Sequence, residues 1–526
     1  MLPARVHRNI YIVLVTLLGG CMVCSTWAAN LVWVLMGANW FLEGWSRPDG
    51  SNWHSTWSEK WRIARQSRAL QAYIAFCLVL MVGLLWTADL GAGLSLLRVK
   101  LPLLVVPLVM LTTPPLEGRV RSVVLALFSG TVLVVSIIAA VRLFTIPDLP
   151  YRDAVPYISH IRFALCCCMV IFISCSGLCR HGGTQAPKLF SIHSAISAVV
   201  LLWMLCFLVL IRSYTAVAVL LVVSLAAVVH YRRRWWAVAV WLVLVGGGAA
   251  VVGHYVHDYY KPAPLMEEPL RECTAGGRPY HHAHDGIVEN GNLLNNYICY
   301  EELHREWGRR SNRPLTEPMY DGYCLETVLI RHLNALGLTK DSAGVWAMND
   351  AAVSAVERGV ANPVYESRNP LRKMVYVMLF EREHYVHTRS VAGFTMLQRF
   401  ELWRATWRVV RQHPLFGVGT GDAVGAMHAE LVAMDSELIG TTKHTHCEYL
   451  SLLAMVGIVG VVVIVIMFLR PLLNGKTARG GMLRSPLMIA WLLTVLVSFL
   501  TEDTLDTLAG ILFCTWFLAM RRGLST

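Results

Sequence analysis

Residues 443–469 read KHTHCEYLSLLAMVGIVGVVVIVIMFL, a pair of histidines followed by an apolar run that is long enough to cross a bilayer. Similar runs recur along most of the chain. Hydrophobic residues make up 56% of the 526 residues, and charged residues make up only 15%. A transmembrane β-barrel would instead show ten-residue segments of alternating polarity. We therefore expect an all-α fold, that of a polytopic membrane protein embedded in a lipid bilayer.

The apolar runs predict about twelve transmembrane helices when each is held to about 20 residues. The expected spans are 9–28, 30–44, 69–87, 94–112, 119–142, 160–178, 194–211, 213–229, 235–253, 447–469, 486–500 and 504–520. The basic start of the chain resembles a cleaved signal peptide, but the many later spans favour a first transmembrane helix. This division predicts transmembrane helices 1–9 in residues 1–253, a loop domain at 254–446 and transmembrane helices 10–12 in residues 447–526.

Basic residues indicate the orientation of the bundle, because cytoplasmic loops are enriched in Lys and Arg. Much of the net charge of +12 lies in short loops, which argues against a nucleic-acid partner. With twelve spans, these basic clusters all fall on the side of the N-terminus: 60–68, 119–121, 180–188, 232–234, 470–484 and 521–522. Both termini are then cytoplasmic, and the large loop lies outside the cytoplasm.

The large loop is predicted to fold as a mostly helical domain. Its segments Leu325–Leu336 and Val375–Tyr385 have the period of amphipathic helices. Asn349 precedes 351–356 as the cap of a further helix. Four cysteines lie in the loop or at its edge, namely Cys273, Cys299, Cys324 and Cys447. Disulfides are allowed outside the cytoplasm and three complete pairings are open, whereas zinc-finger spacing is missing and we expect no metal.

Arg399, Trp403 and Trp407 fall at i, i+4 and i+8, so that they share one face of a helix. An arginine fork binds phosphate oxygens in pairs, and aromatic rings beside it suit a sugar or a lipid. The alternative is an amphipathic helix that packs its tryptophans and carries Arg399 as a surface charge.

His444 and His446 lie at the start of the tenth span or just before it. A helix N-terminus disfavours imidazolium, which keeps a histidine neutral and able to accept a proton, and it also attracts anions. The alternative is a pair of interfacial histidines that reach toward water. The nearby GxGxG run at 417–421 lacks the βαβ context of a nucleotide loop, so we expect a tight turn there.

Arg212 lies in the hairpin between the seventh and eighth spans, on the side where arginine is disfavoured by topology, and is therefore a functional candidate. Lys100, near the outer end of the fourth span, is a weaker one. Glu502, Asp503 and Asp506 lie in the last outer hairpin. Those acids either bind an acceptor, position a cation such as Lys100, or simply cap the hairpin.

Together these residues resemble the O-antigen ligase and polymerase family of bacterial inner-membrane glycan transferases. The matching motifs are Arg399-x-x-x-Trp403, PLFGVG at 414–419, His446-x-x-Tyr449-Leu450 and Gly457-x-x-Gly460. Versions from Bacteroidota look similar at NWFLEG (39–44), KLPLL (100–104) and TEDTL (501–505). The resemblance covers nearly the whole chain. Cys447 departs from it, because the family usually has Asn after the histidine.

The resemblance implies transfer of a glycan from undecaprenyl pyrophosphate at the periplasmic face, without a metal or another cofactor. In the ligases the acceptor is the lipid A–core oligosaccharide. His446 would be the general base on the acceptor hydroxyl, with His444 as the alternative if the register is shifted. Arg399 would bind the donor pyrophosphate, Arg212 would be the second phosphate ligand, and Lys100 is a further candidate for the pyrophosphate. Two arginines on the leaving group reduce the need for acid assistance, whereas the incoming hydroxyl benefits from a base.

Other functions remain open at this stage. A polymerase, or a protein O-oligosaccharyltransferase of the same superfamily, differs from a ligase only in its acceptor. A lipid-linked sugar transporter would place polar groups mid-membrane and show repeats, whereas these spans are nearly uncharged. A non-catalytic envelope scaffold would tolerate changes at Arg399 and His446.

Overall fold

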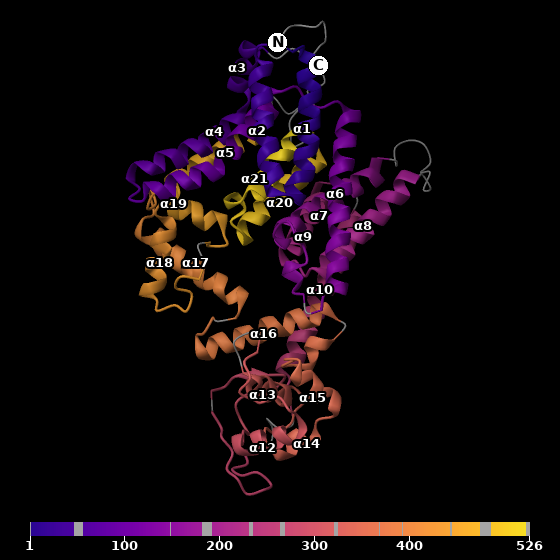
Figure 1. Cartoon of the computed structure of the whole chain (residues 1–526), viewed down its shortest axis with the longest axis vertical. Coiled ribbons are helices and arrows are strands. Elements are labelled where there is room, and N and C mark those ends of the chain that lie inside the picture. The colour runs from indigo at the N-terminus through magenta and orange to yellow at the C-terminus, as the bar shows by residue number, and fades with distance from the viewer. Residues whose placement is uncertain are drawn as a thin grey trace. The chain divides into compact units, whose positions relative to one another are not determined.

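The computed structural model describes residues 2–46, 56–147, 149–180, 192–230, 235–263, 269–283, 285–319, 324–367, 369–391, 393–441, 444–473 and 485–521. The chain divides into two compact units (Figure 1). The first unit comprises residues 1–231, 402–435 and 439–526, and the second comprises 232–401 and 436–438. The predicted boundaries at 253 and 446 follow membrane topology, whereas these units follow packing: α10 (Trp235–Tyr260) packs on α16 (Pro370–Thr388) and so belongs to the second unit.

Every predicted span contains a helix, and the prediction of an all-α membrane protein is confirmed. The helices of the first unit are α1 (Ala4–Cys24), α2 (Thr26–Glu43), α3 (Trp57–Gln66), α4 (Arg68–Val82), η1 (Gly83–Trp86), α5 (Leu90–Thr112), α6 (Gly118–Thr145), η2 (Tyr151–Asp153), α7 (His160–Arg180), α8 (Ile192–Leu210), α9 (Tyr214–His230), α18 (Ala423–Ala433), α19 (Glu448–Leu473), α20 (Pro486–Thr501), η6 (Thr504–Asp506), α21 (Leu508–Trp516) and η7 (Phe517–Met520). Within the described residues, seven helices are long and apolar enough to cross a membrane. The count of twelve spans and the orientation stay predictions. Some of the basic residues that indicate the orientation lie outside the described residues: Lys188, 232–234, 476–484 and Arg522.

The core of the first unit forms where α19 packs along α4, and α21 along α5 and α1. Trp516 of α21 is fully buried, and its indole Nε1–H donates to the Val15 carbonyl of α1 at 2.8 Å. Such a partner is required, because an unpaired indole N–H inside an apolar core costs free energy. These contacts join the C-terminal helices to the N-terminal ones.

A break in α19 positions the segment just before it. Gly457 has φ 64° and ψ −173°, outside the helical region, so the α19 backbone cannot complete its own hydrogen bonds there. The 414–419 turn supplies partners: Val418 N–H donates to Ala454 O at 2.8 Å, and Ile458 N–H donates to Pro414 O at 2.9 Å. The glycine-rich run is thus a turn packed on a membrane helix, as the sequence predicts. Protein-covered breaks of this kind are tolerated at membrane depth.

The second unit is mostly helical, and the predicted loop domain at 254–446 stays a prediction. This unit contains α10, β1 (Val288–Glu289), β2 (Asn292–Leu293), α12 (Tyr300–Arg310), α13 (Leu325–Ala335), α14 (Ser342–Ala347), α15 (Asp350–Glu357), η3 (Pro363–Glu366), α16 and the start of α17 (Thr395–Gln412). The two strands form an antiparallel pair. Asn349 caps α15 by accepting the Ala352 N–H at 2.8 Å, which confirms that prediction.

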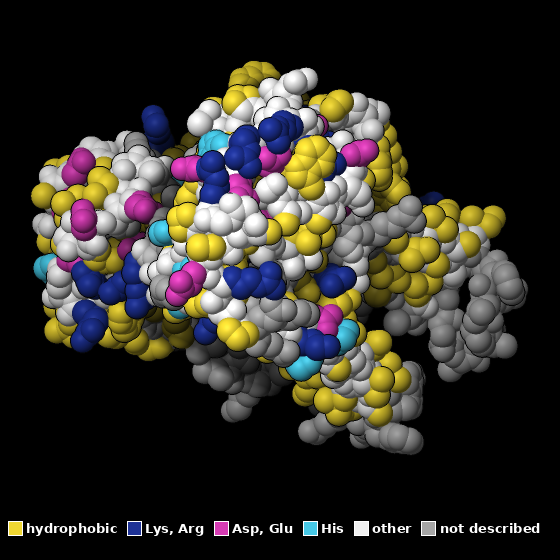
Figure 2. All heavy atoms as spheres, turned by 90° about the horizontal axis from the view of Figure 1, so that it is seen from below, with side chains coloured by type: hydrophobic (Ala, Val, Ile, Leu, Met, Phe, Trp, Pro, Cys, Tyr) yellow, Lys and Arg dark blue, Asp and Glu magenta, His cyan; other side chains and the backbone are white. Residues whose placement is uncertain are grey.

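Polar interactions as well as apolar packing hold this domain. The guanidinium of Arg331 donates twice to the buried Glu289 carboxylate, at 2.9 and 3.0 Å. On the face that Figure 2 shows, Lys and Arg side chains are interspersed with Asp and Glu side chains. Among the described residues, Cys273, Cys299, Cys324 and Cys447 all carry free thiols.

Candidate functional site

Four segments that are far apart in the sequence meet in the first unit. They are α5, the start of α7, residues 444–448 before and at the start of α19, and the hairpin 502–506 between α20 and α21. We call the following set the charged cluster: Lys100, Arg162, His444, His446, Glu448, Glu502, Asp503 and Asp506. Helix α20 ends at Thr501 and Glu502 is extended, which turns the acidic hairpin toward the two histidines.

Asp503 is the centre of this arrangement. Its side chain is 2% exposed, and its Oδ1 lies 2.8 Å from the Thr445 hydroxyl and 2.9 Å from the Ser451 hydroxyl. Its Oδ2 accepts the backbone N–H of His446 at 2.7 Å. These hydrogen bonds give the buried carboxylate partners inside the protein, so its burial is tolerated. Asp503 therefore holds the backbone N–H of His446 together with the hydroxyls of Thr445 and Ser451 on either side of it in the chain.

His446 has a left-handed backbone, with φ 54°, which is uncommon for a residue with a Cβ atom. The N–H bond to Asp503 holds this conformation. The ring is about one third exposed, and its Nδ1 lies 3.8 Å from Glu502 Oε1, an ion-pair distance longer than a direct hydrogen bond. A carboxylate beside one ring nitrogen orients the imidazole and leaves the other nitrogen for a substrate.

Glu502 is in turn held by Arg162, which the sequence did not single out. The Arg162 guanidinium lies 3.9 Å from Glu502 Oε2 and donates to the Asp503 carbonyl at 3.5 Å. Arg162 stands two residues into α7, on the side of the membrane that the predicted topology makes extracytoplasmic. The charge argument that selected Arg212 therefore applies to Arg162 as well.

Lys100 is buried among partners from two other segments. Its ammonium lies 2.9 Å from Asp506 Oδ1 and 3.7 Å from Glu448 Oε1, and it donates to Leu505 O at 3.2 Å. The Lys100 side chain is 2% exposed and that of Glu448 is 1% exposed. Glu448 also accepts the Leu505 N–H at 2.9 Å. The hairpin acid Asp506 thus pairs with Lys100. Glu448 is a second partner, which the sequence marks only as an acid in the first turn of a helix.

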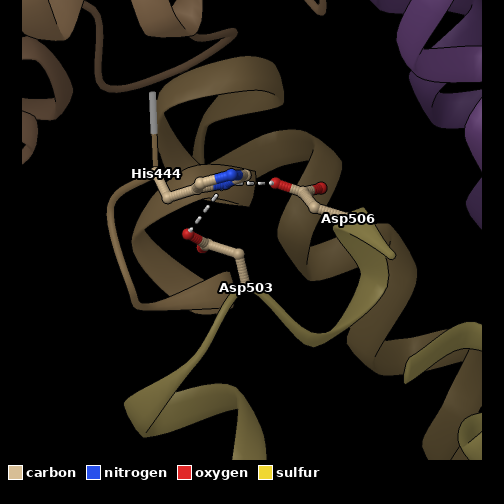
Figure 3. A group of neighbouring side chains, drawn as sticks. All are labelled: His444, Asp503 and Asp506. Atoms are coloured by element: carbon tan, nitrogen blue, oxygen red, sulfur yellow. Dashed lines mark ion pairs between the residues drawn. The ribbon is translucent and has the colours of Figure 1, made fainter. Parts of the chain in front are cut away.

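His444 lies next to both hairpin aspartates (Figure 3). Its Nδ1 is 3.7 Å from Asp506 Oδ2 and 3.9 Å from Asp503 Oδ2. The pKa of His444 is raised, chiefly by its interaction with Asp506 and then by the charge of Asp503, against the opposing effect of burial. His444 therefore favours the imidazolium form more than an isolated histidine does.

These three side chains offer ligand atoms within 4.8 Å of one another, a spacing that a cation can bridge. Both carboxylates already have partners inside the protein, however. The Lys100 ammonium lies 2.9 Å from Asp506, and two hydroxyls and a backbone N–H lie at Asp503. A cation here would add to the positive charge of Lys100, so the residues fit a protein ion pair better than a metal site.

The remaining candidates lie elsewhere. Arg212 is exposed, has φ 50° and places its guanidinium 5.5 Å from the centroid of the Tyr151 ring. Three residues on, Thr215 shares a hydrogen bond of 3.0 Å with Thr501, the residue before Glu502. Arg212 thus lies on the hairpin that packs against the end of α20.

Arg399 and Trp403 both lie on α17, where they are half-buried and one turn apart. Arg399 belongs to the second unit and Trp403 to the first.

Comparison with known proteins finds one family. The family model described as O-antigen ligase matches residues 355–465. This segment contains Arg399, Trp403, His444 and His446, and it ends within α19. Lys100, Arg212 and the acidic hairpin lie outside the matched segment. No curated protein matches the chain.

Proposed function

We propose that this multi-pass membrane protein, whose residues 355–465 match the family model described as O-antigen ligase, is an O-antigen ligase. The reaction is transfer of a polysaccharide from undecaprenyl pyrophosphate to the lipid A–core oligosaccharide. It takes place at the periplasmic face of the bacterial inner membrane, with both termini in the cytoplasm.

In the proposed reaction, a hydroxyl oxygen of the acceptor attacks the anomeric carbon of the donor glycan. The bond from that carbon to the pyrophosphate oxygen breaks, and undecaprenyl pyrophosphate leaves with the bonding electrons. His446 takes the hydroxyl proton, so that atoms and charge balance without a redox step. A base is useful because a sugar hydroxyl is a weak nucleophile at neutral pH.

The observation that carries this proposal is the double support of His446. Asp503 holds its backbone at 2.7 Å, and the Glu502 carboxylate faces its Nδ1 at 3.8 Å. This arrangement orients the imidazole and leaves its other ring nitrogen to accept the proton of the acceptor hydroxyl. His444 faces two carboxylates, which raise its pKa. A larger fraction of His444 than of an isolated histidine therefore already carries a proton. We therefore assign the base to His446 and an orienting role to His444.

Arg399 and Arg212 are the proposed ligands of the donor pyrophosphate, with Trp403 beside Arg399 for the sugar or the lipid. The guanidinium fork suits two phosphate oxygens. Lys100 has a different role in this proposal, because its ammonium is buried and already bound to Asp506 and Leu505. It positions the acidic hairpin that holds His446, and it contacts no phosphate.

The test is a gel profile of surface glycolipid from a deletion strain that is complemented with wild type, His446→Ala or His413→Ala. His413 is an exposed histidine within the same family segment, at the end of α17, and serves as the matched control. We expect His446→Ala to lose polymer on lipid A–core while lipid-linked glycan accumulates, and His413→Ala to behave as wild type.

Other outcomes separate the acceptor classes. A single repeat unit left on the core in the deletion strain would identify a polymerase, and unchanged glycolipid with loss of glycoproteins would identify a protein O-oligosaccharyltransferase. Accumulation of lipid-linked glycan on the cytoplasmic side would point to a transporter. Full restoration by His446→Ala would refute the assignment of the base.

A further inference from the structure

Helix α3 packs on α4 and α5 and is too short to cross a membrane. It has 10 residues and is about 15 Å long at about 1.5 Å per residue, whereas the hydrocarbon core of a bilayer is about 30 Å thick. Ser67 separates α3 from α4, which together with η1 is long and apolar enough to be a span. The backbone of Ser67 is extended, with ψ 98°, so the chain changes direction there. Helix α3 is therefore positioned at the end of a span, at the level of the lipid headgroups.

The inner face of α3 is fixed by a buried ion pair. Lys60, whose side chain is 1% exposed, donates to Glu43 Oε2 at 2.9 Å and to the Trp40 carbonyl. The Lys60 ammonium also lies 4.7 Å from the centroid of the Trp40 ring. Trp40 in turn donates to the Thr112 hydroxyl of α5 at 2.7 Å. Because breaking a buried ion pair is costly, Lys60 sets the rotation of α3 about its axis and turns the opposite face outward.

The outer face of α3 combines an exposed tryptophan with arginines. Trp61, Arg62 and Arg65 share one side of the helix, and all three are exposed. Trp61 is 61% exposed, and the Arg65 guanidinium lies 5.5 Å from the centroid of its ring. Arg62 is 64% exposed and lies 3.4 Å from Glu59, the only acid in the sequence of this helix. Arg68 follows at the start of α4. We call the following set the α3 surface: Trp61, Arg62, Arg65 and Arg68.

The α3 surface has the chemistry of a contact with anionic lipid headgroups. A tryptophan ring is stable at that level, because its body is apolar and its N–H can donate a hydrogen bond. The charge of this surface is positive, since Lys60 is neutralised by Glu43 and three arginines stand against the single carboxylate of Glu59. Arginine forks bind phosphate oxygens in pairs, which suits a phosphodiester. The basic bias of cytoplasmic loops accounts for arginines at this end of the span, but it does not require an exposed tryptophan beside them.

The α3 surface and the charged cluster lie at opposite ends of α5. Thr112, which Trp40 contacts, and Lys100 of the charged cluster are both on this helix, and a rise of about 18 Å along it separates them. A ligand at the α3 surface is thus remote from the histidines and from the acidic hairpin. It is therefore distinct from the donor and the acceptor of the proposed reaction.

We propose that the α3 surface binds the phosphodiester headgroup of an anionic phospholipid of the surrounding bilayer. Arg62 and Arg65 hold the phosphate, and the ring of Trp61 lies beside the glycerol part of the lipid. The lipid approaches from the outside of the unit, so the site needs no cavity. Bound lipid ties α3 to the membrane and thereby holds the ends of α2 and α5 that Lys60 and Trp40 join. The inference does not depend on the proposed function.

The test measures lipid binding to the purified full-length protein in detergent by native mass spectrometry. The probes are dioleoyl phosphatidylglycerol and dioleoyl phosphatidylcholine, which have the same acyl chains but differ in net charge. Arg62→Gln/Arg65→Gln removes two charges from the α3 surface. The matched control is Arg5→Gln/Arg119→Gln, which removes two other exposed arginines on the side of the membrane where the predicted topology places α3.

We expect wild type to bind phosphatidylglycerol at least tenfold more tightly than phosphatidylcholine. The α3 variant should lose about tenfold in affinity for phosphatidylglycerol, because each cation near an anionic surface strengthens binding several-fold, and the control should stay within about twofold of wild type. Equal losses in the two double variants would overturn the proposal, since the general positive charge of this side would then explain the binding. Equal binding of the two lipids by wild type would overturn it as well.

Three further measurements test the place and the identity of the ligand. A phosphatidylglycerol analogue with a photoreactive headgroup, added to wild type, should crosslink to peptides from α3; crosslinks confined to other helices would overturn the site without the use of any variant. Millimolar glycerol 3-phosphate should leave the bound lipid in place, whereas displacement would overturn a membrane lipid as the ligand. Phosphatidylglycerol should raise the Tm of wild type more than that of the α3 variant, since a ligand of the folded state stabilises it, and equal shifts would contradict the proposal.

Discussion

Replacing Lys100 tests whether the charged cluster is held together as the structure indicates. Lys100→Met keeps the length and the apolar stem of the side chain but removes the ammonium. Glu448, 1% exposed, and Asp506, 21% exposed, then lose their shared cation. Breaking a buried ion pair by removing one partner costs about 3–5 kcal/mol, since the other charge stays buried without compensation. We expect the lower end of this range, because Asp506 is partly exposed and retains His444 at 3.7 Å.

The partner variants give a sharper expectation. Glu448→Gln alone leaves Lys100 paired with Asp506, and the amide oxygen can still accept the Leu505 N–H, so we expect a cost of about 1–2 kcal/mol. The double variant Lys100→Met/Glu448→Gln removes both charges of one pair. It should be more stable than Lys100→Met alone, because the carboxylate with the least access to water is no longer charged.

The measurement is thermal unfolding of the purified full-length protein in detergent, followed by tryptophan fluorescence. A cost of about 3 kcal/mol lowers the Tm by roughly 3 °C in a protein of this size. Arg98→Met is the control, because Arg98 lies on the same helix, is exposed, and should change stability by less than about 0.5 kcal/mol. A Tm for Lys100→Met equal to that of Arg98→Met, or a double variant no more stable than Lys100→Met, would refute the reasoning.

Two further predictions follow from other parts of the first unit. The raised pKa of His444 in the folded state means that its contribution to stability is full below the unfolded pKa of about 6.5 and is lost as the pH rises through the folded value. The Tm of wild type should therefore fall more steeply than that of His444→Gln between about pH 6 and pH 8.5; parallel curves would exclude the interaction with Asp506. Gly457→Ala should destabilise the protein by about 1–3 kcal/mol or more, because φ is 64° and a Cβ atom would lie 2.3 Å from Leu415 O. Gly425→Ala, in a helix where a Cβ atom meets nothing within 4 Å, should leave the Tm unchanged or raise it, and equal effects of the two alanines would contradict the break in α19.

The apolar runs were enough to predict the helices. A segment that crosses lipid has to satisfy its backbone hydrogen bonds internally, so it becomes helical. The same runs do not say which helices touch. Lys100 and Asp506 are 406 positions apart in the sequence, and only the predicted topology placed them on the same side of the membrane. That argument anticipated a hairpin acid near Lys100 but could not choose among Glu502, Asp503 and Asp506.

Other parts of the site could not be predicted because their signals are local and ambiguous. Glu448 reads as an ordinary acid in the first turn of a helix, where it stabilises the helix N-terminus. Nothing in the sequence marks His446 for a left-handed backbone, since this conformation depends on an N–H bond to Asp503 from another segment. The break at Gly457 has a glycine as its only sequence signal, and glycines are common in membrane helices.

The charge balance of the cluster argues for a division of labour within the proposed reaction. Four carboxylates, those of Glu448, Glu502, Asp503 and Asp506, face two permanent cations, Lys100 and Arg162. Both cations are already engaged by these carboxylates, so neither is available to a pyrophosphate, and carboxylates beside the two histidines suit proton transfer from a neutral hydroxyl. The cations for the leaving group then have to come from outside the cluster, which is why we assign that role to Arg399 and Arg212. Charge reversal at Arg399 or Arg212 should therefore abolish donor binding, whereas Glu502→Gln should leave donor binding intact and slow the transfer itself.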